Sequence, residues 1–320
     1  MITNMNQRLT KEIAYSKLQA FFNDKPMVFF GTEISCAVDE RFDTLSNGDY
    51  NDHERIQSMT QITAEYGLKF LKGEVKWPAI EIFKRLVKGL PETDRKLHVA
   101  TPNYDLLAEY AFEPAKIPYL TGFIGGICRQ LDWKQCERAV TYVEAVPKGN
   151  KIRKITKLKK HIRLYKVHGS LNTFKLNDDI VENNAWINNV PADVERMMLT
   201  KDTSKMEWLH QNRELLDTFY NAVRDHSSFL FLGFEFNDSQ LNKTLKAKLK
   251  NQKTPGLIII RDSNESVEGF LNECDNLWLV CKHQDNNSTK IYNKQYENWL
   301  YIENKEIWKI ENFTREILGV

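Results

Sequence analysis

Short apolar runs recur along the chain and predict the strands of a buried sheet. Runs of this length that are rich in Val, Ile, Leu and Phe are typical of strands covered on both faces. The runs span residues 27–30, 97–101, 162–167, 229–232, 257–260 and 277–281.

Between these runs, apolar residues recur at the spacing of an amphipathic helix. The segments 9–22, 54–71 and 205–224 show this pattern. Strands that alternate with helices favour a mostly parallel sheet with helices on both faces. We therefore predict an α/β fold, Rossmann-like and doubly wound, with a mostly parallel six-stranded sheet and an inserted helical or hairpin accessory module.

Two gaps between predicted strands are much longer than the ~10–12 residues of a simple crossover. The first gap has helical spacing, and the second suggests extra strands or a hairpin. Neither contains a linker rich in Pro, Gly and Ser, so we expect a single domain over residues 1–320. Its expected parts are a Rossmann core at about 24–36, 93–114 and 160–285, inserts at about 37–92 and 115–159, and a C-terminal segment at about 286–320 that docks on the domain or joins subunits.

The composition is that of an ordinary globular protein, with 42% hydrophobic and 11% aromatic residues. Because 45 basic residues balance 43 acidic ones to a net charge of +2, no overall field attracts nucleic acid or a membrane. No apolar run approaches the ~18 residues of a membrane span, and the N-terminus is too polar for a signal peptide. We expect a cytoplasmic protein without a membrane partner.

The five cysteines give no sign of a metal site or a disulfide framework. They are odd in number, and no two of them form a C-x-x-C motif. We therefore expect buried, unpaired thiols and no metal ligands.

Polar clusters follow four of the predicted strands. They are Gly31-Thr32-Glu33-Ile34-Ser35, Thr101-Pro102-Asn103-Tyr104-Asp105, His168-Gly169-Ser170, and the segment 233–238 from Gly233 to Asp238. In an open parallel sheet, ligands bind beyond the carboxyl ends of the strands, so these clusters are expected to converge on one crevice. Each cluster also has a structural interpretation, since Asn103 or Asp105 can begin a helix and glycines are common in turns.

The motifs TPNYD, VHGS and FLGFEFNDSQL, in this order after a strand that ends in GTEIS, resemble the sirtuin-like domain. The resemblance covers about residues 26–262 and is greatest to the bacterial branch found in antiphage defence. It implies that NAD is bound, that Asn103 contacts the nicotinamide ribose and positions water, and that His168 is the general base. By the same resemblance Gly31, Thr32 and Ser35 bind the phosphate side of NAD. Thr101 fixes the direction of Asn103, and Asp105 does the same or touches the ribose. Gly233 lets the cofactor approach a later strand, and Asp238 has a structural or a ribose-side role.

The chemistry agrees with these residue types. Cleaving the nicotinamide N-glycosidic bond creates an oxocarbenium-like centre, which calls for a positioned amide, a base that titrates near neutral pH and a cavity that limits water. Asn103 and His168 supply the amide and the base.

The chain departs from the sirtuin pattern at two places. Glu33 stands where the family has the second glycine of G-A-G-x-S, and a carboxylate there repels a pyrophosphate unless it points away or meets a cation. The C-x-x-C zinc module of deacetylating sirtuins is absent from the sequence, so no zinc is expected. The resemblance then implies simple hydrolysis of NAD to nicotinamide and ADP-ribose by a toxic effector of antiphage defence. It also implies a homo-oligomer and a possible partner, a HerA-type ATPase. The alternative is a non-catalytic nucleotide-binding or assembly subunit.

Residues 148–166 contain nine Lys or Arg and no acidic residue. Interspersed Ile and Leu residues favour an amphipathic element that packs on the domain and exposes its charges. A surface for DNA or a partner is the alternative, although direct nucleic-acid binding is not favoured because no Phe, Trp or Tyr is interleaved among residues 148–164.

Overall fold

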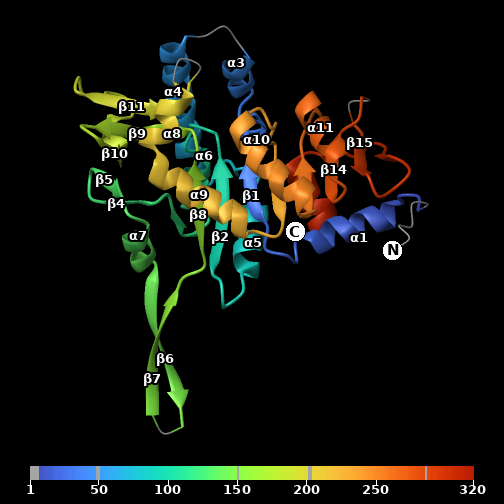
Figure 1. Ribbon diagram of the computed structural model, residues 1–320, viewed down its shortest axis with the longest axis horizontal. Coiled ribbons are helices and arrows are strands. Elements are labelled where there is room, and N and C mark those ends of the chain that lie inside the picture. Colours follow the sequence, from blue (N-terminus) through green and yellow to red (C-terminus); the bar gives the residue numbers. More distant parts are fainter. Residues whose placement is uncertain (1–6, 48–50, 150, 201–203, 285–286) are drawn as a thin grey trace.

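The computed structural model describes residues 7–47, 51–149, 151–200, 204–284 and 287–320 (Figure 1). All six predicted strands are present: β1 (Met27–Phe30), β2 (Lys96–Thr101), β8 (His161–Lys166), β12 (Phe229–Leu232), β13 (Gly256–Ile259) and β14 (Leu277–Lys282). They lie in the order β8-β2-β1-β12-β13-β14, and each neighbouring pair is parallel. The chain order reverses between β1 and β12, as in a doubly wound Rossmann sheet. The predicted α/β fold is confirmed.

The main sheet has nine strands, so the predicted number of six is too low. β3 (Tyr119–Leu120) adds to β8 in parallel, and β15 (Thr289–Asn293) and β16 (Leu300–Ile302) extend the sheet beyond β14 in antiparallel pairing. β3 has only two residues, and β15 alternates buried with less buried side chains, so neither forms a continuous apolar run. Apolar runs identify the doubly covered strands at the centre of a sheet and miss its edges.

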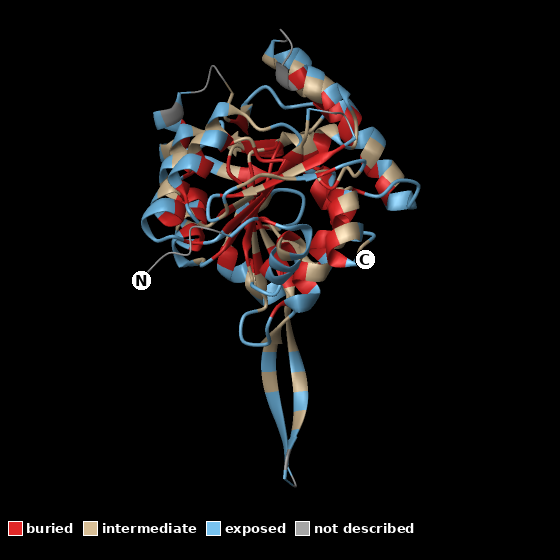
Figure 2. Cartoon of the chain, turned by 90° about the vertical axis from the view of Figure 1, so that its right-hand side faces the viewer, coloured by how far each residue is buried: buried red, intermediate tan, exposed pale blue. Residues whose placement is uncertain are grey.

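Helices cover both faces of this sheet. One face packs against α1 (Lys11–Phe21), α2 (Thr32–Cys36), α3 (Arg41–Asn47), α4 (Asp52–Lys72), α5 (Ile80–Gly89), α6 (Leu107–Phe112) and α12 (Ile310–Phe313). The other packs against α7 (Trp133–Ala139), α8 (Lys205–Gln211), α9 (Arg213–Asp225), α10 (Ser239–Lys246) and α11 (Glu265–Glu273). Because successive strand residues face opposite sides, Val28 and Phe30 join the first core while Met27 and Phe29 join the second. Figure 2 shows the buried sheet between helices that carry both buried and exposed residues.

A second, five-stranded antiparallel sheet lies beside the main one, in the order β11-β9-β10-β5-β4. It consists of β4 (Phe123–Gly125), β5 (Arg129–Leu131), β9 (Gly169–Leu176), β10 (Asp179–Glu182) and β11 (Val194–Met198), with a short 3-10 turn η1 (Asn184–Trp186). β9 begins at the residue after His168, so this sheet fixes the chain that leaves β8. Two π-type turns, η2 (Ala247–Asn251) and η3 (Thr314–Leu318), continue α10 and α12.

The basic stretch forms part of a protruding hairpin. β6 (Thr141–Lys148) and β7 (Lys151–Leu158) pair along their whole length and project away from the body (Figures 1 and 2). Residue 150, between them in the sequence, lies outside the described residues. The prediction that the apolar residues of this stretch pack on the domain is wrong for β7, where Ile152 is 76% exposed. Residues 161–166 instead form β8 in the buried sheet.

No helix among the described residues has both the length and the apolar character needed to cross a membrane.

Candidate functional site

The TPNYD segment makes a tight junction between β2 and α6. Thr101 ends the strand, and its side-chain Oγ1 accepts a hydrogen bond of 3.1 Å from the backbone N–H of Asn103. Oδ1 of Asp105 accepts a hydrogen bond of 3.1 Å from the backbone N–H of Leu107, the first residue of α6. The side chains of Thr101 and Asp105 therefore stabilise the turn through hydrogen bonds to its backbone.

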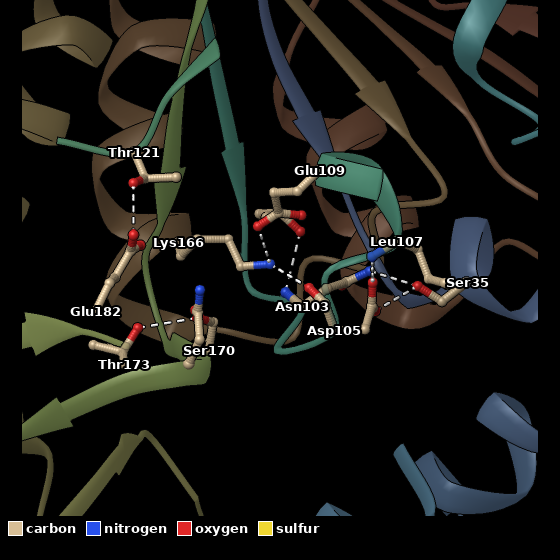
Figure 3. A network of polar contacts seen from close by, with 12 residues as sticks. Ser35, Asn103, Asp105, Leu107, Glu109, Thr121, Lys166, Ser170, Thr173 and Glu182 are labelled. Atoms are coloured by element: carbon tan, nitrogen blue, oxygen red, sulfur yellow. Dashed lines mark hydrogen bonds and ion pairs between the residues drawn. The ribbon is translucent and has the colours of Figure 1, made fainter. Parts of the chain in front are cut away.

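The amide of Asn103 is held in one orientation by its NH₂ group. Nδ2 donates to the backbone carbonyl of Gly31 at 3.1 Å and to Oγ of Ser35 at 3.0 Å. Ser35 in turn donates to Oδ2 of Asp105 at 2.8 Å, a contact visible in Figure 3. Oδ1 of Asn103 is buried and has no hydrogen-bond partner among the described residues. Since a buried oxygen without a partner costs free energy, this atom is a preoriented acceptor for a ligand or water.

His168 follows β8 and faces a carboxylate. Its Nε2 lies 2.9 Å from Oδ2 of Asp238. The other oxygen of Asp238 accepts hydrogen bonds from the backbone N–H groups of Gln240 and Leu241 at 2.7 and 3.0 Å and so caps the start of α10. A helix N-terminus thus fixes the carboxylate that orients the imidazole.

Asn103 and His168 line the same cavity, of about 260 Å³. The wall also contains Gly31, Thr32 and Asp238, and its apolar part includes aromatic side chains of the β12–α10 loop. Residues that follow four different strands therefore meet at one crevice, as expected for a doubly wound sheet.

A second cavity, of about 560 Å³, adjoins the first on the other side of the β1–α2 junction. Thr32, Glu235 and Asn237 line both cavities. Their combined volume lies within the range of known small-molecule sites, which is ~300–1,000 Å³. The two cavities therefore share part of their walls at the β1–α2 junction and the β12–α10 loop.

Gly31 and Gly233 bring the ends of β1 and β12 into close contact. A Cβ atom on Gly31 would lie 2.3 Å from the carbonyl oxygen of Gly233, and one on Gly233, whose φ is +54°, would lie 2.7 Å from Cβ of Glu33. Both glycines are thus required by backbone packing alone. Gly233 lines the second cavity, whereas its predicted contact with a cofactor stays a prediction.

Glu33 lines the second cavity, and its Oε2 accepts a hydrogen bond of 2.8 Å from the backbone N–H of Arg261. Burial raises the pKa of this carboxyl to about 7; the nearby Arg261 opposes the rise and Glu235 adds to it. The carboxylate therefore changes charge near neutral pH in the part of the site next to the α2 N-terminus.

The remaining predicted residues lie behind the cavities. Thr101 and Ser35 are buried and act through their hydrogen bonds to Asn103. The lining residues that the sequence interpretation missed include two arginines: Arg55, which reaches the first cavity from α4, and Arg261, which lines the second. Arg261 comes two residues after β13, so inspection of every strand end could have found it; nothing in the local sequence marks Arg55.

The structure contains no group of three or more His, Cys, Asp or Glu side chains, over the ranges it describes, that could hold a metal ion. The five cysteines are free thiols, three of them buried. Whether the protein uses zinc stays a prediction of the sequence.

Comparison with known proteins places this architecture in a family. Residues 97–279 match the SIR2-like domain. One similar solved structure, described under the mechanism and regulation of Sir2 enzymes, aligns with a TM-score of 0.41 and 11% identity over 82% of this chain and 90% of that chain. Another, a mutant Sir2 homologue in complex with 2′-O-acetyl ADP-ribose, aligns with a TM-score of 0.43 and 12% identity over 95% and 98%. No curated protein gave a match. Since the family match spans more than half of the sequence, the chain belongs to the SIR2-like domain family.

Proposed function

We propose that the protein is an NAD glycohydrolase that cleaves NAD to nicotinamide and ADP-ribose. The observation that carries this proposal is the joint lining of one cavity by Asn103 and His168, with Oδ1 of Asn103 buried and lacking a partner among the described residues. Membership of the SIR2-like family supports NAD as the substrate.

In the proposed reaction, the bond between C1′ of the nicotinamide ribose and the ring nitrogen breaks, and neutral nicotinamide leaves with the electron pair. A water oxygen then bonds to C1′. Oδ1 of Asn103 accepts a hydrogen bond from this water or from a ribose hydroxyl, and His168 takes the proton that the water loses. Asp238, 2.9 Å from the imidazole, stabilises the resulting imidazolium.

The hydrogen bonds behind Asn103 serve this chemistry by preorganisation. The amide cannot rotate without losing its bonds to Gly31 and Ser35. A dipole held in place before the reaction stabilises developing charge without reorganising during it, which is the main source of electrostatic catalysis.

The adenosine part of NAD is assigned to the second cavity, beyond the shared residue Thr32. Glu33 there carries a carboxyl whose pKa is raised to about 7 by burial. Its neutral form avoids repulsion with the pyrophosphate, so we expect NAD to bind more tightly as the pH falls below 7.

Purified protein incubated with NAD is expected to release nicotinamide. Asn103→Ala and His168→Ala should each lower the rate by about 10²-fold or more, because each removes a group that acts in the transition state. Asn221→Ala and His210→Ala, at exposed positions outside the lining of the cavities, serve as matched controls with unchanged rates.

The second candidate is a nucleotide-binding or assembly subunit without activity. Glu33 and Glu235 favour it, since they are two of the four carboxyl groups that line the cavity assigned to adenosine and its phosphates. Calorimetry separates the two proposals: NAD that binds without release of nicotinamide, alone and with candidate partners, supports the non-catalytic subunit.

From the motif resemblance we further infer a role as the NAD-depleting effector of a bacterial antiphage system. In this role it would act as a homo-oligomer, with a HerA-type ATPase as its candidate partner. Expression in cells should lower NAD on infection in the wild type and leave it unchanged in Asn103→Ala. A normal NAD level in infected wild-type cells argues against this role.

A further inference from the structure

A separate polar cavity, of about 300 Å³, lies between α4, α6 and the second sheet. Its wall includes Thr60 and Thr63 of α4, Glu109 of α6, Tyr119 and Glu182. None of its lining residues lines either cavity assigned to NAD. It is therefore a distinct site, built from both inserts and the second sheet.

Three side-chain oxygens of this wall lack a hydrogen-bond partner among the described residues. They are Oγ1 of Thr60, Oγ1 of Thr63 and Oε2 of Glu109. Their residues are only 9%, 4% and 8% exposed, so bulk water does not satisfy them. Buried polar atoms that no protein group satisfies are where a bound ligand or ordered water is expected.

Three carboxyl groups line this wall, against one cation, Arg129. Arg129 pairs with Glu182 at 3.3 Å, and Lys166 pairs with Glu109 at 3.3 Å from behind the cavity, while Glu113 adds a third carboxylate to the wall. Burial raises the pKa of Glu182 to about 7 and raises that of Glu109, so the two cations do not fully offset the cost of burying these carboxylates.

The geometry points to a binding site for a small aliphatic ammonium compound of the diamine or polyamine class. A primary ammonium group has three N–H donors, and three residues of the wall each carry one unpaired oxygen, on a carboxyl group in Glu109 and on a hydroxyl in Thr60 and Thr63. Glu113 lies one helical turn beyond Glu109, where it can meet a second ammonium group. Tyr110 and Tyr119 complete the wall with aromatic rings, which attract cations.

Lys166 connects this cavity to the proposed NAD site. Its Nζ pairs with Oε1 of Glu109 and also donates to the backbone carbonyl of Asp105, in the loop that carries Asn103 (Figure 3). An ammonium group at Glu109 competes with Lys166 for the same carboxylate. Its binding is therefore expected to alter the hydrogen bond from Lys166 to the backbone carbonyl of Asp105. This link to turnover rests on the proposed function, whereas the binding site does not.

The binding site is tested by calorimetry with 1,4-diaminobutane at pH 7 and with 1,4-butanediol as its uncharged match. We expect saturable binding of one diamine per chain and none of the diol. Glu109→Gln should weaken diamine binding by at least about tenfold, and the isosteric Thr63→Val should weaken it as well. Glu268→Gln, which changes an exposed carboxylate on α11, should have no effect.

The proposal is overturned if the diamine shows no saturable heat up to about 10 mM, which means that water alone fills the cavity. It is equally overturned if the diol binds as well as the diamine, or if folded Thr63→Val and Glu109→Gln bind the diamine like the wild type. If Glu109→Gln does not fold, the diamine affinity of Thr63→Val alone decides whether the proposal holds. Because the measurement needs no NAD, its failure is distinguishable from a failure of the proposed hydrolase activity.

Discussion

Ser35 connects Asn103 with Asp105 in the TPNYD turn, and replacing it by Ala tests how strongly these hydrogen bonds stabilise the site. Its hydroxyl accepts a hydrogen bond from Asn103 at 3.0 Å and donates one to Asp105 at 2.8 Å. The substitution removes one oxygen atom and, with it, both hydrogen bonds. Asn103 keeps its bond to Gly31, and Asp105 keeps its bond to Leu107.

The expected cost follows from the two bonds and their burial. A hydrogen bond to a carboxylate contributes about 1.5–3 kcal/mol and one between neutral groups about 0.5–1.5 kcal/mol. Ser35, Asn103 and Asp105 are 2%, 6% and 4% exposed, so water does not readily replace the lost hydroxyl. We expect Ser35→Ala to lower the free energy of unfolding by about 2–4 kcal/mol.

Urea unfolding at pH 7 measures this cost against Ser228→Ala. Ser228 is also 2% exposed, but its Oγ has no hydrogen-bond partner within the described part of the chain. Its removal should change the free energy of unfolding by less than about 0.5 kcal/mol. If Ser35→Ala is no more destabilised than Ser228→Ala, the turn is not held by this connection and the reasoning about Asn103 is refuted.

Three further changes test other parts of the molecule. Asp238→Asn should preserve the cap of α10 and the free energy of unfolding, since Asn caps a helix as well as Asp does. It should nevertheless lower NAD turnover by about 10²-fold or more, and unchanged turnover would show that the pair with His168 does not contribute to catalysis. Burial raises the pKa of Glu182 from 4.5 to about 7, so its contribution to stability is full below pH 4.5 and is lost as the pH rises through 7. In urea unfolding, the free energy of unfolding of Glu182→Gln relative to that of the wild type should therefore rise by up to about 3 kcal/mol between pH 5 and pH 8. A pH-independent difference between the two would contradict this. Replacing residues 144–155 by Asn-Gly should shift the unfolding free energy by less than about 1 kcal/mol, because β6 and β7 contact chiefly each other; a large loss would mean that the hairpin supports the body.

The centre of the fold could be predicted because its strands are buried on both faces. Continuous apolar runs such as residues 229–232 leave little choice of structure, and their ends then bring Asn103 and His168 to one crevice. The edges could not be predicted in this way. β15 alternates buried and less buried residues, and β3 is only two residues long.

The β6–β7 hairpin shows that an amphipathic sequence pattern does not by itself determine which residues are buried. The apolar residues of β7 suggested a buried face, but burial depends on whether another element covers that face, which the local sequence does not record. The same limit applies to Lys166 and Glu109. They lie in different segments and pair only through the tertiary fold, so the polar cavity beside them could not be predicted from spacing.

The most direct test of the proposed hydrolase follows nicotinamide and ADP-ribose together in one time course, for the wild type and for Asn103→Ala. We expect equal molar amounts of the two products from the wild type, and a rate lower by about 10²-fold or more from the variant at a similar free energy of unfolding. Release of nicotinamide at the same rate by folded Asn103→Ala would contradict it.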